Sequence, residues 1–314
     1  MRAARVHEFG SPLSLDDVPE PTPAAGETVV ELAYVSVNPL DIWVTRGTVA
    51  GGRQRLPFIP GTEAVATVDG RHYFINPPGY GTQRDGFYAE RAAVPEAALV
   101  PLPPNADGAE SAALGVVGVT AWRLVRDVAK VSAGDRILVL GAGGGVGSLL
   151  LQLCRATGAT TWGQTSSQDK TDWVRELGAE RAVVAEAAQL QQAVAELRPT
   201  VIFDPLGDGY TAAALDAVEP HGRVALFGVS AGPEGTLNLR AMYRKGAFLL
   251  TYSGLSEPPE KTRAALEEVL GELAAGRIRV PVDEVLPLER AAEAHQRILD
   301  RQVRGKLILR PARS

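Results

Sequence analysis

A cluster of glycines in the middle of the chain limits the possible folds more strongly than any other feature. Residues 141–147 read Gly-Ala-Gly-Gly-Gly-Val-Gly; they follow the strand-like run 136–140, which is apolar after Arg136, and precede the helix-compatible stretch 149–154. Glycines at a strand–turn–helix junction permit a tight turn and let backbone N–H groups approach a phosphate at the positive end of the helix dipole. A flexible glycine loop is the alternative, but strands and helices continue to alternate after the turn, as the motif requires.

The sequence therefore predicts a dinucleotide-binding turn in which an alanine replaces the first motif glycine. The predicted pyrophosphate contacts are Gly141, Ala142, Gly143, Gly144, Gly145, Val146 and Gly147.

The chain has two parts that differ in their sequence pattern. Up to about residue 105 it is rich in Pro and Gly and contains short β-type runs at 27–37, 64–68, 72–75 and 88–94, which predict a small barrel or sandwich. A long connecting helix is predicted at 109–128. Strands are then expected at 136–140, 160–165, 183–184, 201–203 and 223–227, and helices at 169–177, 186–197 and 208–217. Strands alternating with helices at this spacing predict a doubly wound parallel sheet, and hence an α/β protein.

The last part of the chain is mixed. An amphipathic helix is predicted at 260–275, a strand at 280–286, a helix at 288–299 and a final strand at 306–309. We expect this tail to rejoin the N-terminal part. The predicted domains are therefore a first part over 1–115, a dinucleotide-binding domain over 116–250 and a returning segment over 251–314.

Composition excludes several classes of protein. A net charge of −5 over 314 residues and only five scattered lysines argue against binding to nucleic acid, which needs clustered positive charge. Cys154 is the only cysteine, so neither an intrachain disulfide nor a thiolate zinc cage can form. No stretch approaches the roughly 20 apolar residues of a membrane span, and no apolar targeting segment opens the chain. We expect a cytoplasmic protein with no membrane contact.

The segment after the second predicted nucleotide strand bears on which dinucleotide binds. NAD enzymes place an acid there, about 20 residues beyond the turn, on the ribose 2′-hydroxyl. Here the chain has Thr165, Ser166 and Ser167, followed by Lys170. Hydroxyls and an ammonium can hold a 2′-phosphate that an acid would repel, so the segment favours NADPH. Helix capping by the serines and a solvated helix face for the lysine are compatible alternatives.

Several further motifs occur along the whole chain: Val-Asn-Pro-Leu-Asp at 37–41, Ile-Pro-Gly-Thr-Glu at 59–63, Gly-Phe-Tyr-Ala-Glu at 86–90, Gly-Val-Thr-Ala-Trp at 118–122, Ala-Gly-Asp at 133–135 and Arg-Glu-Leu-Gly-Ala at 175–179. With the 141–147 turn, they make the chain resemble the medium-chain dehydrogenase/reductase superfamily, and specifically its zinc-free quinone oxidoreductase (ζ-crystallin-like) branch. The resemblance implies a GroES-like β-barrel catalytic domain beside a Rossmann domain.

The resemblance also implies chemistry without zinc. Zinc-dependent relatives use a Cys near Asn38, a His at the position of Thr62 and a Cys where Val116 and Val117 stand, and the remaining Glu63 cannot hold a metal alone. Without a Lewis acid, the expected reaction is hydride delivery to a conjugated acceptor that is already electron-poor.

The resemblance assigns residues to the reacting centre. It implies that Asn38 lies near the nicotinamide ribose and substrate, that Trp43 stands where relatives carry a cleft-lining Tyr, and that Thr120 contacts the nicotinamide. The alternatives are a turn residue before Pro39 for Asn38 and a buried hydroxyl bonding its own helix for Thr120. Trp43 cannot act as a phenolic acid, so the proton is expected from solvent. Asp41 is expected to brace the loop.

Further cofactor contacts are implied near the carboxamide for the backbone of Phe227, Gly228 and Val229, and near the cofactor for Lys306. A solubility lysine on a strand edge is the alternative for Lys306. The chain departs from the pattern at Ala185 and Glu186, where many relatives carry a Tyr, and in a short loop at 65–72. None of the four histidines (7, 72, 221 and 295) matches a catalytic position, and we predict surface or packing roles for them.

The sequence thus predicts an NADPH-dependent reductase of quinones or similar conjugated carbonyls. An enoyl-thioester or 2-alkenal reductase is the nearest alternative, and a non-catalytic nucleotide-binding protein is the third. We also expect a homodimer, paired through the apolar run 246–251 as an edge strand, although the same run could form an ordinary core strand.

Overall fold

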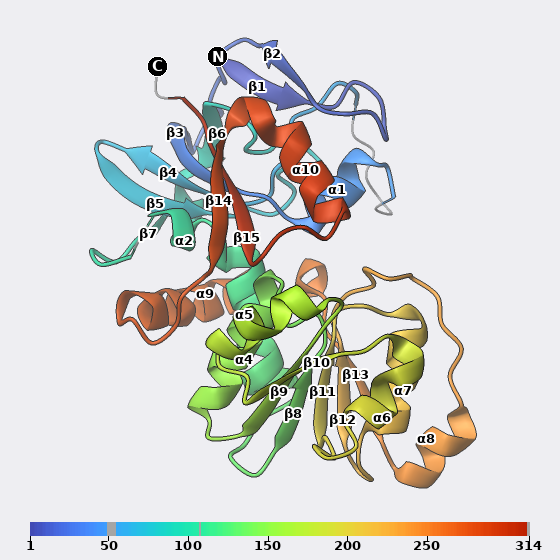
Figure 1. Cartoon of the computed structure of the whole chain (residues 1–314). Helices are drawn as coiled ribbons and strands as arrows, with labels where there is room; N and C mark the ends of the chain where they lie inside the picture. The colour runs from blue at the N-terminus through green and yellow to red at the C-terminus, as the bar shows by residue number, and fades with distance from the viewer. Residues whose placement is uncertain (49–54, 107, 313–314) are drawn as a thin grey trace. The chain divides into compact units, whose positions relative to one another are not determined.

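The computed structural model describes residues 1–48, 55–106 and 108–312, and the chain divides into two compact units. Unit 1 comprises Met1–Val116 and Leu266–Ser314, and unit 2 comprises Val117–Ala265. The return to unit 1 thus begins at Leu266, inside a helix, whereas the sequence pattern predicts this boundary at 251. In Figure 1, unit 1 runs from blue to cyan and ends in red, and unit 2 runs from green to orange.

Unit 1 is built around a seven-stranded, mostly antiparallel sheet of order β14-β15-β3-β4-β5-β7, with β6 also paired to β3. A separate hairpin pairs β1 with β2. The strands are β1 (Arg2–Arg5), β2 (Ser14–Asp17), β3 (Glu27–Ser36), β4 (Ala64–Val68), β5 (Arg71–Ile75), β6 (Arg91–Pro95), β7 (Val100–Pro101), β14 (Val282–Pro287) and β15 (Lys306–Arg310). The helices are α1 (Pro39–Thr45), α2 (Gly108–Ser111) and α10 (Ala291–Leu299).

The core of unit 1 joins residues from both ends of the chain. Val30, Ala64 and Tyr88 pack in one cluster with Leu286 and Leu307. The tail is held there because β15 pairs with β14 on one side and with β3 on the other.

Unit 2 contains the predicted doubly wound sheet. Its six strands are all parallel and have the order β10-β9-β8-β11-β12-β13. They are β8 (Arg136–Val139), β9 (Thr160–Thr165), β10 (Arg181–Val184), β11 (Val201–Asp204), β12 (Arg223–Leu226) and β13 (Phe248–Thr251). The helices are α3 (Val119–Arg123), α4 (Gly145–Ala156), α5 (Thr171–Glu176), α6 (Leu190–Ala193), α7 (Asp208–Ala217) and α8 (Leu239–Lys245), while α9 (Pro259–Ala274) spans the division between the units.

Helices α4 and α5 cover one face of this sheet, and α6 and α7 cover the other (Figure 1). The sheet strands carry apolar residues on both faces, as parallel strands must when helices cover both sides. β8, for example, buries Ile137, Leu138 and Val139 completely. The predicted α/β class and the pairing of a β-rich unit with a doubly wound sheet are therefore confirmed.

Several predicted elements differ in detail. The helix expected at 109–128 is broken into α2 and α3 and two π-helical turns at Leu114–Gly118 and Leu124–Val128. The helix expected at 186–197 shortens to α6, preceded by a 3-10 turn at Ala187–Gln189. The strand expected at 88–94 lies at 91–95, and helices α1 and α8 were not predicted. Among the described residues, no helix combines the length and the apolar composition that crossing a membrane requires.

Candidate functional site

The glycine turn of unit 2 has the geometry that backbone binding of an anion needs. Gly141 adopts a φ of +59°, which favours glycine, and α4 begins at Gly145. A Cβ placed on Gly147 would lie 2.6 Å from the backbone oxygen of Gly141, so no larger residue fits there. Ala142 is completely buried. A Cβ on Gly163 of β9 would approach the Cβ of Ala142 to 2.8 Å, so the turn packs directly on the neighbouring strand.

The first turn of α4 can offer backbone donors to this site. Ser148 is the first residue of the helix whose N–H bonds back, to the oxygen of Gly144 at 2.9 Å. The N–H groups of Gly145, Val146 and Gly147 precede it and have no partner within the helix. Together with the positive end of the helix dipole, they form a cradle suited to a phosphate.

Gln164, which the sequence analysis did not single out, holds the turn in place. Its side-chain oxygen accepts the N–H of Gly141 at 3.0 Å, and its backbone oxygen accepts that of Ala142 at 2.9 Å. Its amide nitrogen donates to the backbone oxygens of Thr165 and Ala185. No sequence motif marks this role, because Gln164 reaches the turn only through the pairing of β8 with β9.

The polar segment after β9 lies beside the same turn. Thr165 is buried, Ser166 is exposed, and Ser167 and Lys170 are partly buried. Ser167 precedes a 3-10 turn, but its hydroxyl makes no capping hydrogen bond, so capping does not account for it. The Cδ of Lys170 lies 4.0 Å from the position that a Cβ on Gly143 would occupy. The lysine stem therefore lies along the glycine turn.

The predicted cofactor contacts at 227–229, which follow β12, lie against the loop after β11, and this loop in turn contacts the glycine turn. The Pro205 ring lies 3.2 Å from the position of a Cβ on Gly141. The N–H groups of Ser230 and Ala231 donate to the backbone oxygens of Pro205 and Leu206, which ties the segment after β12 to this loop. The structure thus brings residues 141–147 and 227–229 together at the carboxyl edge of the sheet, between β8 and β11, where the winding direction reverses. Ligands of doubly wound sheets bind at this point.

Asp204 organises this loop and was missed in the sequence analysis. It is completely buried at the end of β11, where its carboxylate accepts the N–H groups of Leu206 and Gly207 and the hydroxyl of Thr211. Burial raises the pKa of Asp204 above its usual value. Thr120, the remaining predicted contact in unit 2, lies half-buried on α3 between the two π-helical turns.

Unit 1 contains a buried polar network around Asn38. The amide oxygen of Asn38 accepts a hydrogen bond from the Lys306 ammonium at 2.6 Å, and its amide nitrogen donates to Glu63 Oε1 at 2.9 Å. Lys306 also donates to the backbone oxygen of Val37, and Glu63 Oε2 accepts the N–H of Val116 at 2.7 Å. Asn38 and Glu63 are fully buried, and Lys306 is 4% exposed. Because β15 has strands on both sides, the strand-edge alternative for Lys306 is wrong.

A second branch of this network runs through Asp41. Its carboxylate accepts the backbone N–H of Asn38 at 2.8 Å, which confirms that Asp41 braces the loop, and the hydroxyl of Tyr88 donates to it at 3.3 Å. The Tyr88 hydroxyl also lies 3.2 Å from Nε2 of His295 on α10. His295 is therefore a buried packing residue with a polar partner.

Burial shifts the pKa values of the charged groups in this network, and the neighbouring charges modify those shifts. Burial raises the pKa of Asp41 to about 7, against the stabilising effects of the Asn38 N–H and of Lys306. Burial likewise raises the pKa of Glu63 and lowers that of Lys306, and each of these two charges opposes the shift of the other. Burial lowers the pKa of His295 to about 4, so this imidazole is neutral at physiological pH.

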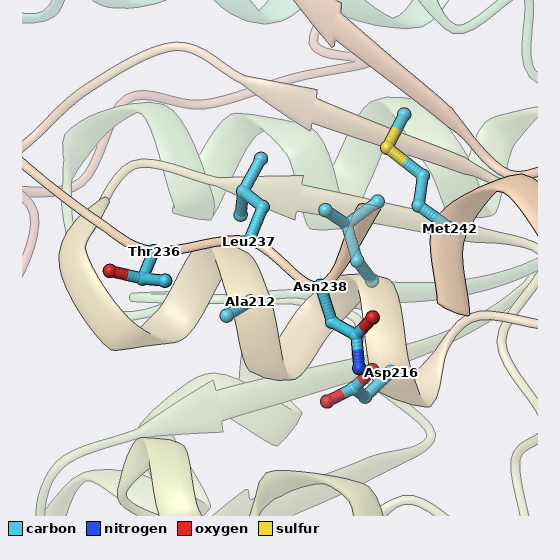
Figure 2. A pocket seen from close by; sticks show the side chains of 7 residues that line it. Ala212, Asp216, Thr236, Leu237, Asn238 and Met242 are labelled. Carbon is cyan, nitrogen blue, oxygen red and sulfur yellow. The ribbon is translucent and has the colours of Figure 1, made fainter. Parts of the chain in front are cut away.

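The structure also contains a cavity of about 260 Å³ that the sequence analysis did not anticipate. It lies in unit 2 between α7, α8 and the segment that precedes α8 (Figure 2). Leu215, Leu237 and Met242 give it apolar walls. At its rim, the side-chain oxygen of Asn238 accepts the N–H of Ala241 and caps α8. None of the residues that line it belongs to the predicted cofactor contacts.

Comparison with known proteins places the chain in a family. It is 30% identical to the quinone oxidoreductase of Sus scrofa over 98% of this chain and 97% of the relative. The chain belongs to the quinone oxidoreductase branch of the medium-chain dehydrogenase/reductase superfamily. It is accordingly an NAD(P)-dependent oxidoreductase that acts on a small molecule.

Solved structures of this superfamily agree over the full length. The quinone oxidoreductase of Thermus thermophilus, described free and with NADPH, has a TM-score of 0.85 and 30% identity and covers 99% of this chain, which covers 100% of it. An NAD-dependent alcohol dehydrogenase has a TM-score of 0.88 and 30% identity, with 99% of each chain covered. The relatives therefore include users of both dinucleotides.

A family model for zinc-binding dehydrogenases matches residues 177–309. This range contains none of the positions 38, 62, 63 and 116 at which zinc-dependent relatives are expected to bind the metal. Within residues 1–48, 55–106 and 108–312, no group of three or more His, Cys, Asp or Glu side chains is arranged to hold a metal ion.

Proposed function

We propose that this oxidoreductase uses NADPH and delivers its hydride to a quinone or a similar conjugated carbonyl compound, without zinc. The observation that carries the choice of NADPH is the segment after β9. Ser166 and Ser167 stand where an acid would select NADH, and the stem of Lys170 lies along the glycine turn. Two hydroxyls and an ammonium at this place favour a 2′-phosphate.

The cradle at the glycine turn fits the pyrophosphate of such a cofactor. The N–H groups of the first turn of α4 are directed to that position, and Gly147 leaves room that a Cβ would fill. We propose that the backbone of Phe227, Gly228 and Val229 contacts the carboxamide and that Thr120 contacts the nicotinamide.

When bound, NADPH supplies a hydride from C4 of its nicotinamide. The contribution of the chain is to bind and orient the two reactants, which alone can account for a large part of a rate enhancement. Trp43 lies half-buried on α1, and we propose that it lines the acceptor site. An indole has no acidic proton to give, so the proton that completes the reduction comes from solvent.

The donors at the expected zinc positions support a reaction without metal. Asn38 offers an amide whose oxygen already accepts from Lys306, and Thr62 offers a neutral hydroxyl. Glu63 is the only carboxylate among them, and its two oxygens accept hydrogen bonds from Asn38 and Val116. Zinc prefers thiolate and imidazole ligands, which this set lacks. Activity that survives dialysis against a strong chelator is the expected result, and activity restored only by added zinc would refute the proposal.

The test of the acceptor is a steady-state screen of NADPH oxidation with 1,2- and 1,4-quinones, 2-alkenals and enoyl-CoA thioesters. We expect the quinones to give the highest kcat/KM. Turnover of 2-alkenals or enoyl thioesters alone would favour the alternative reductase, and no turnover with any acceptor would refute both.

The test of the cofactor is Ser166→Asp. A carboxylate there repels the 2′-phosphate, so the ratio of kcat/KM for NADPH to that for NADH should fall about ten-fold or more. Ser256→Asp is the matched control, because Ser256 is also exposed in unit 2 but lies in the 3-10 turn Gly254–Ser256, after β13. An unchanged ratio in Ser166→Asp would remove the basis for NADPH.

We further propose a cytoplasmic homodimer that pairs through β13. This strand is the last in the order of its sheet, and Phe248 on it is 54% exposed. An unpaired edge strand with an exposed aromatic side chain is suited to pairing with a second copy.

A further inference from the structure

The amide of Asn38 is bound at both ends, and the polarity of each bond is fixed by the partner. Lys306 has only donors, so it must face the amide oxygen, at 2.6 Å. An ionised Glu63 has only acceptors, so it must face the amide nitrogen, at 2.9 Å. The Asn38 side chain therefore has a single possible orientation.

Asn38 in turn fixes the start of α1. Its backbone N–H donates to Asp41 at 2.8 Å, and its backbone oxygen accepts the N–H of Asp41 at 3.1 Å. Asn38 adopts an extended conformation immediately before Pro39, the first residue of the helix. Trp43 lies on this helix, two residues after Asp41. A continuous chain of contacts thus runs from Lys306 and Glu63 through Asn38 to the helix that carries Trp43.

We propose that Lys306 and Glu63 are positioning residues, which act through Asn38 on α1 and so set the place of Trp43 in the acceptor site. The proposal rests on the proposed function only for the role of Trp43 in binding the acceptor. Lys306 is thereby assigned to the loop before α1, in place of the direct contact with the cofactor that the family resemblance implied.

The hydrogen bonds of Glu63 make a stringent test possible. A Gln at this position has one acceptor and one donor end, whereas the Glu63 oxygens accept from two donors, Asn38 Nδ2 and Val116 N. Whichever way the Gln amide is turned, its NH₂ group faces another N–H. Glu63→Gln therefore breaks one buried hydrogen bond although it changes neither size nor shape.

A second substitution should repair this damage. In Asn38→Asp/Glu63→Gln, the Gln can donate to the new carboxylate and accept from Val116, while the carboxylate still accepts from Lys306. The total charge of the network is the same as in the wild-type protein. Asn38→Asp alone instead places a second carboxylate against Glu63.

Two readouts follow the position of Trp43 in the full-length protein. The first is its emission, obtained by subtracting the spectrum of the same chain carrying Trp43→Phe, which removes the contributions of the other three tryptophans. The second is the KM for a quinone acceptor, compared with the KM for NADPH. We expect each single variant to shift the Trp43 emission and to raise the acceptor KM by up to about ten-fold, because α1 shifts to relieve the unpaired buried polar group. The NADPH KM should stay unchanged in Glu63→Gln, and the double variant should return the Trp43 emission and the acceptor KM to wild-type values.

Glu31→Gln is the matched control, because it makes the same chemical change at an exposed position of unit 1. Single variants that leave the Trp43 emission and the acceptor KM unchanged would overturn the proposal. So would a double variant that recovers its Tm without recovering these readouts, because Asn38 would then itself contact the reactants. A wild-type protein without turnover would refute the proposed function, and the Trp43 emission would still test the positioning.

Discussion

The buried imidazole of His295 makes a quantitative prediction about stability. The ring lies on α10 with Nε2 3.2 Å from the Tyr88 hydroxyl, and the two rings meet edge to face at 5.6 Å. Burial, and to a smaller extent the charge of Arg46, lowers the pKa of His295 from 6.5 to about 4. The folded protein therefore stays unprotonated at this site over a range in which the unfolded chain takes up a proton.

The sign and size of the effect follow from linkage. Above about pH 6.5 both states are neutral and the site contributes no pH dependence; as pH falls from there to about 4, the unfolded state alone gains a proton and the folded state loses relative stability. A shift from 6.5 to about 4, at about 1.4 kcal/mol for each pH unit, corresponds to about 3 kcal/mol.

The perturbation is His295→Gln, which offers a side-chain amide to the Tyr88 hydroxyl in place of the imidazole but cannot take up a proton in this range. The free energy of unfolding is measured by urea denaturation of both proteins between about pH 4 and about pH 7. Subtracting the two curves cancels every other titrating group. The difference should favour the wild-type protein by about 3 kcal/mol more at the upper end than at the lower end.

His72→Gln makes the same chemical change at an exposed position of unit 1 and provides the control for the substitution itself. A His295→Gln curve parallel to that of the wild-type protein would refute the reasoning, because it would mean that the buried imidazole is protonated as readily as a free one.

Three further predictions follow from the two units. Asp41→Asn should give the opposite pH dependence, because burial raises the pKa of this carboxyl from 3.8 to about 7. As pH rises through that range, the free energy of unfolding of the wild-type protein should fall by up to about 4 kcal/mol relative to that of the variant, measured by the same urea denaturation series. Gly147→Ala should abolish NADPH binding measured by fluorescence titration, because its Cβ would meet the Gly141 oxygen at 2.6 Å, whereas Gly134→Ala meets nothing within 4 Å and should bind normally. Phe248→Glu should convert a dimer to monomers in light scattering, and a wild-type protein that is already monomeric would contradict the proposed pairing through β13.

The glycine turn of unit 2 and the elements that flank it were largely predictable because their determinants are local. The glycine turn, the strand before it and the helix after it are consecutive in the chain, and the conformation of such a turn depends on which residues are glycine. Lys170 is also near the turn in the sequence, because only α4 and β9 lie between them. The residues that hold the turn and the loop after β11 in place were not predictable. Gln164 and Asp204 act through side-chain hydrogen bonds to backbone groups, and neither belongs to a recognisable spacing.

The network in unit 1 was not predictable in the same way, because its members are far apart in the sequence. Lys306 and Asn38 are 268 residues apart, and Tyr88 and His295 are 207 residues apart. They meet because β15 inserts between β14 and β3, which no local pattern specifies. Family resemblance pointed to Asn38 and Lys306 one at a time, but only the fold shows that they bind each other.

The composition of this network argues that it does more than stabilise unit 1. Glu63, Asp41 and Lys306 are taken out of water together, and replacing such buried charges by apolar side chains often leaves a protein equally or more stable. Their arrangement instead gives one amide, that of Asn38, a single orientation at the start of a short helix. An apolar core could fill the same space, but it could not distinguish the two ends of an amide. The energetic cost of the buried charges is therefore best explained by the precision with which they place α1.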